Sequence, residues 1–318
     1  MSGGAGLIGS HLVDVLLAGG DQVTVVDDFS TGRRGNIDHL ADDARFHVIE
    51  ADLTRDLPPA LLAGRYDRIY HLASPASPPD FVRRPLETLL VNSVGTRALL
   101  DLAQAGGARF LLASTSEVYG DPLVHPQTEA YWGNVNPIGP RSCYDEAKRF
   151  AESFTVAMTR TTGVDARIAR IFNTYGPRSR PDDGRLIPSF CSQALRDEPL
   201  TIFGDGSQTR SFCYVTDLVR GLAALMETPG LAGEVVNLGN PREMTILEVA
   251  ERVRALTGTT SPLIHQPLPT DDPIRRQPDI AKARHVLGWE PEIDLDDGLR
   301  RTLDAFRQIV KTSPVPSR

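Results

Sequence analysis

Short apolar runs alternate with longer amphipathic stretches along this chain of 318 residues. A short apolar run is typical of a buried strand, and apolar residues that recur every three or four positions indicate a helix. Strands are expected at residues 22–26, 46–50, 68–73, 110–113, 165–171 and 235–239, and helices at 10–17, 85–105, 144–162, 245–257, 282–287 and 295–310. Strands that alternate with helices predict an α/β fold, a doubly wound parallel sheet with right-handed crossovers.

The chain opens with a glycine-rich segment that leads directly into the first predicted helix. Gly3, Gly6 and Gly9 form a G-x-x-G-x-x-G pattern, and such glycines let the backbone approach a pyrophosphate at the helix N-terminus. A glycine-rich turn without a ligand gives the same letters, so the pattern needs support from its context. Only Met1 and Ser2 precede the pattern, so the buried strand that should lead into it is missing, with a loss of apolar burial. We therefore expect the natural start to lie upstream.

An acidic pair supplies the context that the glycine pattern needs. The predicted strand at residues 22–26 ends in Asp27 and Asp28, and Asp27 follows Gly9 by 18 residues. A carboxylate at about this distance can hydrogen-bond the adenosine ribose and repels a 2′-phosphate, which favours NAD over NADP. Arg33 and Arg34 lie nearby. Because an arginine at such a position can bind a 2′-phosphate, the preference for NAD stays open. Residues 51–53, after the next strand, are expected to line the adenine pocket.

Polar residues follow the fourth predicted strand. Thr115, Ser116 and Glu117 come after the apolar run 110–113, at a strand's carboxyl end, where open α/β sheets bind ligands. Tyr144 and Lys148 are one turn apart on a predicted helix, so their side chains point the same way. An ammonium beside a phenol favours the phenolate, so we expect Lys148 to lower the pKa of Tyr144 and suit it to proton transfer. Helices produce Tyr-x-x-x-Lys by chance, and the pair gains its weight from the dinucleotide pattern upstream.

Composition narrows the class of protein. The net charge of −7 argues against a general nucleic-acid binder, and no apolar run approaches the ~20 residues that a membrane span needs. The first residues lack the basic region of a signal peptide. The cysteines lie far apart without metal-ligand spacing, so we expect reduced thiols of a cytoplasmic protein and no metal site. These cysteines are Cys143, Cys191 and Cys213.

Several arginines fall in predicted loops or strand edges of this acidic chain. Most arginines are solvated surface charges, but arginine is also the side chain suited to gripping a diphosphate. Arg210, in the segment GDGSQTR, and Arg275, after the segment PTDDP, are the best placed for that role. The others in such positions are Arg178, Arg180, Arg185 and Arg276.

Longer segments resemble the extended short-chain dehydrogenase/reductases, and specifically the UDP-glucuronate decarboxylases (UDP-xylose synthases). The segments that carry the resemblance are HLASPASPP (71–79), STSEVYGDP (114–122), HPQ (125–127), YWGNVNPIGPRSCYDEAK (131–148), GDGSQTRSF (204–212) and DDPIRRQPDI (271–280). The resemblance covers essentially the whole chain and implies a Rossmann-type sheet with a smaller, discontinuous substrate domain. The expected division is residues 1–173 with about 211–242 for NAD, about 174–210 with 243–312 for the nucleotide sugar, and 313–318 as a tail.

The resemblance also implies a reaction. Tyr144, helped by Lys148, takes the proton of the sugar C4 hydroxyl of UDP-glucuronate while NAD accepts the C4 hydride. The resulting 4-ketone stands β to the C6 carboxylate and accepts the electrons released as CO2 leaves. Reprotonation of the ring carbon and return of the hydride then give UDP-xylose. In this scheme Glu117 assists oxidation and decarboxylation, and Ser116 hydrogen-bonds near the reacting carbons.

The implied site residues fall into three groups. The catalytic group is Tyr144, Lys148, Glu117 and Ser116. Cofactor contacts are expected from Gly3, Gly6, Leu7, Ile8, Asp27, Asp28, Thr31, Gly32, Asp52, Leu53, Leu72, Ala73, Ser74, Asn92, Thr115, Tyr144 and Lys148. Substrate contacts are expected from Pro78, Ser116, Glu117, Asn173, Arg178, Arg185, Arg210 and Arg275, of which Arg178 and Arg185 also suit the cofactor or the surface.

Relatives on the same fold leave alternatives open. Sugar-nucleotide 4,6-dehydratases carry an Asp-Glu pair where Ser116 and Glu117 stand here, and C4 epimerases typically lack a glutamate like Glu117. A decarboxylase that releases the 4-keto pentose with NADH also remains open, as does a non-catalytic NAD-binding protein. The preference for UDP or TDP is undecided. The resemblance further implies a homodimer in which the Asn92 and Tyr144 helices form a four-helix bundle with their symmetry mates.

Overall fold

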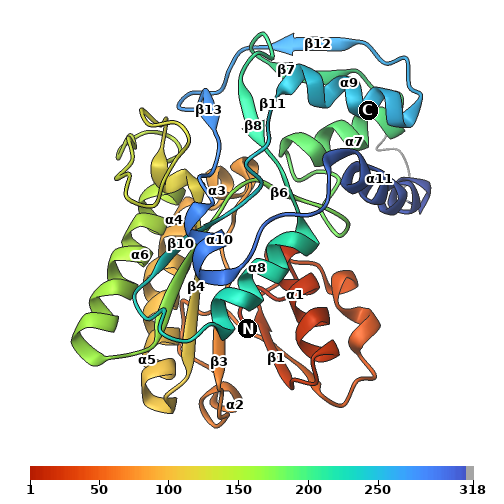
Figure 1. Ribbon diagram of the computed structural model, residues 1–318. Coiled ribbons are helices and arrows are strands. Elements are labelled where there is room, and N and C mark those ends of the chain that lie inside the picture. The colour runs from red at the N-terminus through yellow and green to blue at the C-terminus, as the bar shows by residue number, and fades with distance from the viewer. Residues whose placement is uncertain (313–318) are drawn as a thin grey trace.

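Six parallel strands form the sheet of a large lobe (Figure 1). The structure is a computed structural model that describes residues 1–312, and the predicted tail at 313–318 lies outside the described residues. The strand order is β10-β5-β4-β3 and then β1-β2, with Ser2 bridging the two groups. This order confirms the predicted doubly wound sheet. The strands are β1 (Val23–Asp27), β2 (Phe46–Glu50), β3 (Arg68–His71), β4 (Arg109–Thr115), β5 (Ala166–Ile171) and β10 (Val235–Leu238).

The two residues before the glycine loop take the place of a central strand. Ser2 forms parallel bridges with both Val26 and His71. Its amide donates a hydrogen bond to the carbonyl of Tyr70 (2.9 Å), and the amide of Val26 donates to the carbonyl of Met1 (2.8 Å). No named strand is found here, as the sequence indicates, but backbone pairing continues from β1 to β3 through these two residues.

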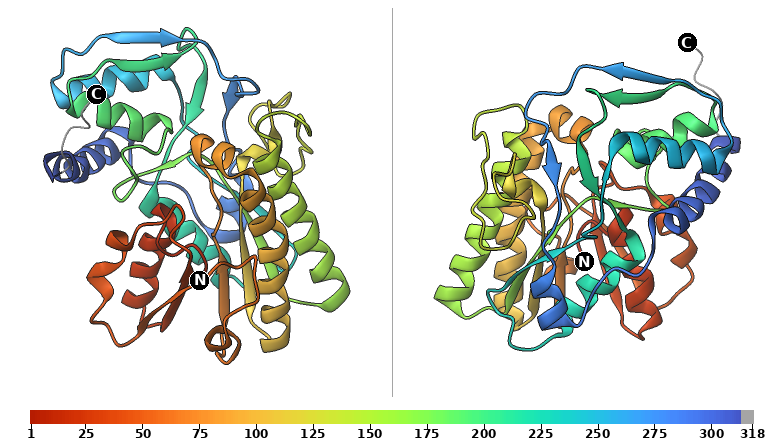
Figure 2. Two further views of the ribbon diagram at one scale, coloured as in Figure 1. Left: turned by 180° about the vertical axis from the view of Figure 1, so that it is seen from behind. Right: turned by 45° about the horizontal axis from the view of Figure 1, so that its top comes forward.

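Helices cover both faces of the sheet (Figures 1 and 2). One face carries α1 (Leu7–Ala18), α8 (Val215–Glu227) and α10 (Ala281–Leu287); the other carries α4 (Pro85–Leu90), the π-helical turn Val91–Gly95, α5 (Thr96–Gly106) and α6 (Ser142–Thr162). Successive residues of β4 point to opposite faces of the sheet. Leu111 packs in the α1–α8 core, and Phe110 and Leu112 pack in the α5–α6 core. A strand segment buried on both faces is apolar at successive positions, and this is why residues 110–113 of β4 form an unbroken apolar run.

A smaller lobe lies above the carboxyl ends of the strands (Figure 1). Its helices α7 (Leu186–Leu195), α9 (Ile246–Thr257) and α11 (Leu295–Thr312) contact one another. Strand β7 (Leu200–Phe203) pairs with β12 (Leu263–Gln266), and β8 (Thr209–Ser211) pairs with β11 (Glu243–Thr245) and β13 (Arg275–Arg276). At the start of α9, Thr245 and Glu248 form a capping box.

Shorter elements join the two lobes. A two-stranded pair, β6 (Thr174–Tyr175) and β9 (Cys213–Tyr214), lies where the chain leaves the large lobe and returns to it. The remaining short helices are α2 (Pro59–Leu62), α3 (Pro78–Arg83), and the 3-10 turns Arg34–Asn36, Asp38–Leu40 and Ser116–Tyr119. Helix α10 packs on β10 and α8 rather than on the smaller lobe, so the C-terminal segment serves both lobes. The domain boundaries given by the sequence remain predictions.

Two local predictions need correction. The prolines of residues 74–79 predict a loop. Pro78 and Pro79 instead open α3, because proline fits the first helical turn, where its missing N–H is not needed. The expected helix at 85–105 is interrupted by the π-helical turn around Asn92. Helices α7 and α8 were not predicted. Within residues 1–312, no helix has both the length and the apolar character to cross a membrane.

Replacing Leu111 by alanine should lower the free energy of unfolding by about 2–5 kcal/mol, because it leaves a cavity in a central strand. Urea denaturation followed by circular dichroism measures the change. The control is Leu123→Ala: that side chain is 81% exposed, so the change should stay within about 0.5 kcal/mol. Equal losses in the two variants would contradict the placement of Leu111 in the core.

Candidate active site

A cavity of about 760 Å³ opens between the lobes at the carboxyl ends of the strands. Its walls come from the glycine loop, the ends of β3, β4 and β5, α3, α6, and the segment from Arg178 to α7. Predicted site residues that line it are Gly3, Gly6, Leu7, Ile8, Thr31, Leu72, Ser74, Pro78, Thr115, Ser116, Glu117, Tyr144, Lys148, Asn173, Arg178, Arg185 and Arg210. The fold thus brings most of the predicted site residues together in this cavity.

The glycine loop has the shape that a dinucleotide pyrophosphate requires. A Cβ at Gly9 would lie 2.1 Å from the carbonyl oxygen of Gly3, and one at Gly3, where φ is +74°, would lie 2.6 Å from the amide nitrogen of Ala73. At Gly6 the nearest atom would be 3.4 Å away, so this side is open. No side chain caps the N-terminus of α1, and Gly6, Leu7 and Ile8 line the cavity, so this helix end suits an anion. The loop therefore fits the diphosphate of NAD.

Asp27 supports this loop from the end of β1. Its carboxylate accepts hydrogen bonds from the amides of Ala5 and Phe29, both at 2.9 Å. Burial raises the pKa of Asp27, and the two amide donors oppose that rise. Asp28 is exposed and accepts a hydrogen bond from the amide of Ser30 (2.9 Å). Of the acidic pair, Asp27 is therefore the residue that the structure connects to the glycine loop.

Both nearby arginines are engaged within the protein. Arg33 donates through Nη2 to the carbonyls of Arg178 and Ser179, both at 3.3 Å. Arg34 forms an ion pair with Glu50. Neither guanidinium is free of protein partners, which lowers its fitness for a 2′-phosphate and agrees with a preference for NAD.

The other predicted cofactor residues lie behind the cavity wall or beyond it. Asn92 is buried and donates to the hydroxyl of Ser74 (2.9 Å), which does line the cavity. Asp52 instead accepts hydrogen bonds from Thr54 and lies near Arg55. The predicted residues that do not line the cavity are Asp27, Asp28, Gly32, Asp52, Leu53, Ala73, Asn92 and Arg275.

Tyr144 is buried against the cavity wall. Its ring stacks on Phe81 with 5.1 Å between ring centroids and an interplanar angle of 5°. Thr115 hydrogen-bonds the phenol. Lys148 does not bond to the phenol: its Nζ donates to the carbonyl of Ala113 (2.8 Å) and lies 5.9 Å from the centroid of the tyrosine ring. The two side chains share a helix face, as the spacing predicts, but Lys148 also holds the end of β4.

The pKa values differ from the sequence-based expectation. Burial raises the pKa of Tyr144 to about 12, and the hydrogen bond from Thr115 only partly opposes it. Burial also lowers the pKa of Lys148 to about 7, against the negative charge of Glu152. The expected low pKa of Tyr144 is wrong for this structure, because burial outweighs the two groups that lower the pKa, Thr115 and Arg185. Spacing places two side chains on one face but does not show the desolvation that both undergo.

Glu117 is held between two arginines. Its Oε2 accepts a hydrogen bond from Arg141 at 2.7 Å, and its Oε1 pairs with Arg276. Burial favours the neutral acid, but the two guanidiniums outweigh it and lower the pKa of Glu117 to about 2. The predicted contact Arg275 is exposed, whereas Arg276 is buried and lines the cavity. The sequence therefore predicts Arg275, whereas the arginine that reaches the site is its neighbour Arg276.

Arg210 belongs to the same charge cluster. Its Nη2 pairs with Asp272 at 2.9 Å, and Arg141 reaches the other oxygen of Asp272 at 3.6 Å. The cluster joins β8 of the smaller lobe to the start of α6 in the large lobe. Two acids and three arginines therefore form one side of the cavity, and the acids fix the arginine positions.

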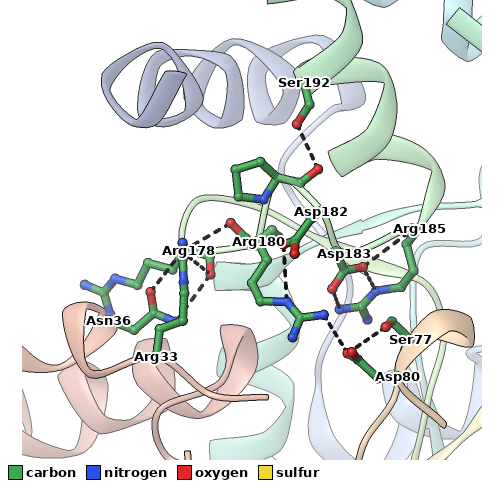
Figure 3. A network of polar contacts seen from close by, with 12 residues as sticks. Arg33, Asn36, Ser77, Asp80, Arg178, Arg180, Asp182, Asp183, Arg185 and Ser192 are labelled. Carbon is green, nitrogen blue, oxygen red and sulfur yellow. Dashed lines mark hydrogen bonds and ion pairs between the residues drawn. The ribbon is translucent and has the colours of Figure 1, made fainter. Parts of the chain in front are cut away.

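The segment after β6 ties the cofactor side of the cavity to the smaller lobe (Figure 3). Besides Arg33, Asn36 donates to the carbonyl of Arg178 (3.3 Å) and to that of Ala5 in the glycine loop (2.9 Å). The Arg178 side chain pairs with Asp14 of α1 at 2.7 Å. Its Nη1 is buried without a protein partner and so has a donor available for an anion.

Farther along this segment, two ion pairs (Figure 3) are formed by residues that line the cavity. Arg180 pairs with Asp80 of α3 at 2.7 Å, and the hydroxyl of Ser77 donates to the same carboxylate oxygen (2.7 Å). Asp183 binds Arg185 through both carboxylate oxygens, at 2.5 and 2.8 Å. The sequence did not predict the acidic partners, because Asp183 lies in a loop and Asp80 in the short helix α3, and neither segment has periodicity. Nor did it predict Arg141, whose only signal is its place three residues before Tyr144.

Comparison with known proteins identifies the family. The family model described as GDP-mannose 4,6 dehydratase matches residues 1–302. The chain belongs to this family. UDP-glucuronic acid decarboxylase 1 of Arabidopsis thaliana is 53% identical over 307 residues, which is 96% of this chain and 69% of that protein.

Solved structures agree on the fold. A UDP-glucuronic acid 4-epimerase from Bacillus cereus, in complex with UDP-glucuronic acid and NAD, is 32% identical with a TM-score of 0.87 and covers 97% of this chain and 98% of that one. A dTDP-glucose 4,6-dehydratase from Streptomyces venezuelae with NAD bound is 31% identical with a TM-score of 0.87, covering 96% of each chain. Enzymes that catalyse different reactions thus share this fold, so the reaction must be inferred from the residues of the site.

Replacing Glu117 by glutamine should change the acid stability of the protein. A carboxylate whose pKa falls from 4.5 to about 2 on folding contributes of the order of 3 kcal/mol above pH 4.5, and this is lost as pH falls toward 2. Unfolding measured between pH 7 and 2 should therefore show a shallower acid loss in Glu117→Gln. The variant should also be less stable at pH 7, because Arg276 loses its buried partner. Glu146→Gln, at the helix surface, is the control; a variant curve parallel to wild type would contradict the ion-pair assignment.

Proposed function

We propose that this chain decarboxylates UDP-glucuronate to UDP-xylose, with NAD oxidising and then reducing the sugar at C4. The observation that carries the proposal is the Ser116–Glu117 end of β4, which lies in one cavity with Tyr144 and Lys148. Decarboxylases are also the relatives with 51–54% identity. The epimerase and the dehydratase described above are more distant, at 32% and 31% identity.

The residues present fit NAD. The open side of Gly6 and the uncapped α1 N-terminus suit its diphosphate, and Asp27 stands at the ribose end of the loop. The partly free guanidinium of Arg178 is a second candidate for the diphosphate. When bound, NAD takes the C4 hydride and gives it back after CO2 has left.

Tyr144 acts as the base for the C4 hydroxyl in this proposal. Tyr144 can accept this proton only as the phenolate, so its phenol must first lose its own proton to solvent. The hydrogen bond from Thr115 and the charge of Arg185 favour that ionised form against the burial that raises the pKa. Lys148 supports Tyr144 indirectly: it donates a hydrogen bond to the carbonyl of Ala113 and so holds the end of β4 in place. The same phenol returns the proton when C4 is reduced again.

Glu117 serves as a fixed charge rather than as a proton donor at neutral pH. Two arginines hold it ionised and in one position, so it can orient a substrate hydroxyl or a water molecule as a hydrogen-bond acceptor. Arg210 and Arg276 are the side chains that we assign to the anionic groups of the nucleotide sugar, with Arg276 replacing Arg275. Asn173 and Pro78 complete the proposed substrate contacts.

Incubation with UDP-glucuronate and NAD should release CO2 and form UDP-xylose without standing NADH absorbance. Accumulating NADH would mean that the 4-keto pentose escapes, and UDP-galacturonate without CO2 would establish the epimerase instead. NAD bound with no reaction would support a non-catalytic protein. The TDP sugar, tested in parallel, decides the base preference.

Tyr144→Phe should lower kcat by about 10²–10⁴-fold, because the proton acceptor is lost while the ring packing against Phe81 remains. The control Tyr66→Phe removes a hydroxyl that bonds only the carbonyl of Leu61, away from the cavity. Activity of Tyr144→Phe within threefold of the control would contradict the assigned base.

We also propose a cytoplasmic homodimer, the location resting on the cysteine pattern alone. An apolar face on α4, the π-helical turn and α6 supports the dimer: Leu86, Leu90, Val94 and Phe150 are each at least 43% exposed. Exposed apolar side chains gathered on neighbouring helices mark an association surface, and a two-fold contact would pair this face with itself.

Leu90→Arg should convert the dimer to a monomer, because it places a charge in the apolar contact. Light scattering coupled to size exclusion measures the mass at a fixed concentration. Leu123→Arg, on the loop before Tyr131, is the control and should remain dimeric. A wild-type monomer, or a dimer that survives Leu90→Arg, would contradict the interface.

A further inference from the structure

A buried acid lies behind the Tyr144–Lys148 pair and does not line the cavity. Glu152 is one turn beyond Lys148 and two turns beyond Tyr144 on α6, so the three side chains share one face of the helix. Glu152 is 8% exposed. A buried carboxylate is costly unless it is paired, so its partners show what keeps it there.

Its partners come from the ends of two strands. Oε1 accepts hydrogen bonds from the hydroxyl of Ser114 (2.5 Å) and from Nε of Arg170 (2.9 Å), and Oε2 accepts from Nη2 of Arg170 (2.7 Å). Arg170 also donates to the phenol oxygen of Tyr119 (3.0 Å). Glu152 therefore connects α6 to β4 and β5, just before β4 delivers Thr115 to the cavity.

Lys148 and Glu152 hold adjacent residues of the same strand end. Lys148 binds the carbonyl of Ala113, and Glu152 binds the side chain of Ser114. Lys148 is near Tyr144 and Glu152 on its own helix and His71 on β3. Arg170 on β5 pairs with Glu152 and offsets part of its charge. Burial holds the pKa of His71 far below its usual value, at about 3, so it is neutral. Glu152 is then the negative charge that offsets the desolvation of the lysine.

We propose that Glu152 is a positioning residue for the catalytic pair: its charge favours the protonated form of Lys148, and its hydrogen bonds fix the end of β4. It touches neither the cavity nor the reacting atoms. The proposal rests on the proposed function only for its kinetic test. Its electrostatic part concerns the protein alone and can be measured without substrate.

The chain offers an unusually direct measurement, because it contains only three lysines, Lys148, Lys282 and Lys311. Protein labelled with ¹³C at lysine Cε should give three titrating signals, and Lys282→Arg and Lys311→Arg assign them. In Glu152→Gln the pKa of Lys148 should fall by about one unit, which is a tenfold change in the proton equilibrium. Glu146→Gln, on the surface of the same helix, should leave it unchanged. An unshifted Lys148 signal in Glu152→Gln would overturn the proposal.

Two further variants separate charge from geometry and remain informative if Glu152→Gln does not fold. Ser114→Ala removes a hydrogen bond and keeps the charge, and Glu152→Asp keeps the charge at a shorter reach. Both should leave the pKa of Lys148 within a few tenths of a unit of wild type. A shift of a full unit in either variant would show that strand position, not charge, controls the lysine, and would overturn the electrostatic role.

The kinetic test uses the pH profile. In Glu152→Gln the alkaline limb of kcat should move to lower pH by the shift seen for Lys148, so that activity falls about tenfold at pH 8, about twofold at pH 6 and little at pH 5. Glu152→Asp should restore the wild-type profile. A uniform loss at every pH would indicate a merely structural role and count against the proposal. If wild type shows no decarboxylation, the proposed function fails, and the lysine titration still tests Glu152.

Discussion

Four consecutive polar side chains at the end of β4 must all find partners in a largely buried place. Ser114, Thr115 and Ser116 are buried, and the Glu117 side chain is 15% exposed. A buried polar group without a partner costs more than its hydrogen bond contributes. Ser114, Thr115 and Glu117 meet this constraint with groups from distant parts of the chain. Several of those groups also line the cavity.

Each partner of this strand end determines the position of another element. Glu152 and Lys148 bind α6 to β4, so the helix that carries Tyr144 cannot slide along the sheet. Glu117 binds Arg276 of β13, so the small lobe is attached to the large one directly at the cavity. Breaking one of these buried contacts leaves its partner uncompensated. Stability and site geometry therefore depend on the same contacts, and a change in one is expected to alter the other.

The sequence predicts well what depends on local pattern. Apolar runs identify the strands, and the residue after a strand end lies at the ligand edge by topology, so Thr115 and Glu117 are placed correctly. Spacing puts Tyr144 and Lys148 on one face of α6. Pattern cannot decide between Arg275 and Arg276, because β13 has two residues and neighbours on a strand point to opposite sides. Nor can it show that burial raises one pKa and lowers another, since desolvation depends on segments far away in the chain.

The arginines of the cavity show how an acidic protein can bind an anionic ligand. Arg180 and Arg185 are each held by an aspartate on the cavity wall. The pairing weakens the net positive field, but it also fixes long side chains before the ligand arrives, so less conformational entropy is lost on binding. Buried N–H groups of Arg141, Arg178 and Arg276 still lack protein partners. An anion that supplies those acceptors joins ion pairs already in place, so its specificity comes from the positions of the donors rather than from total charge.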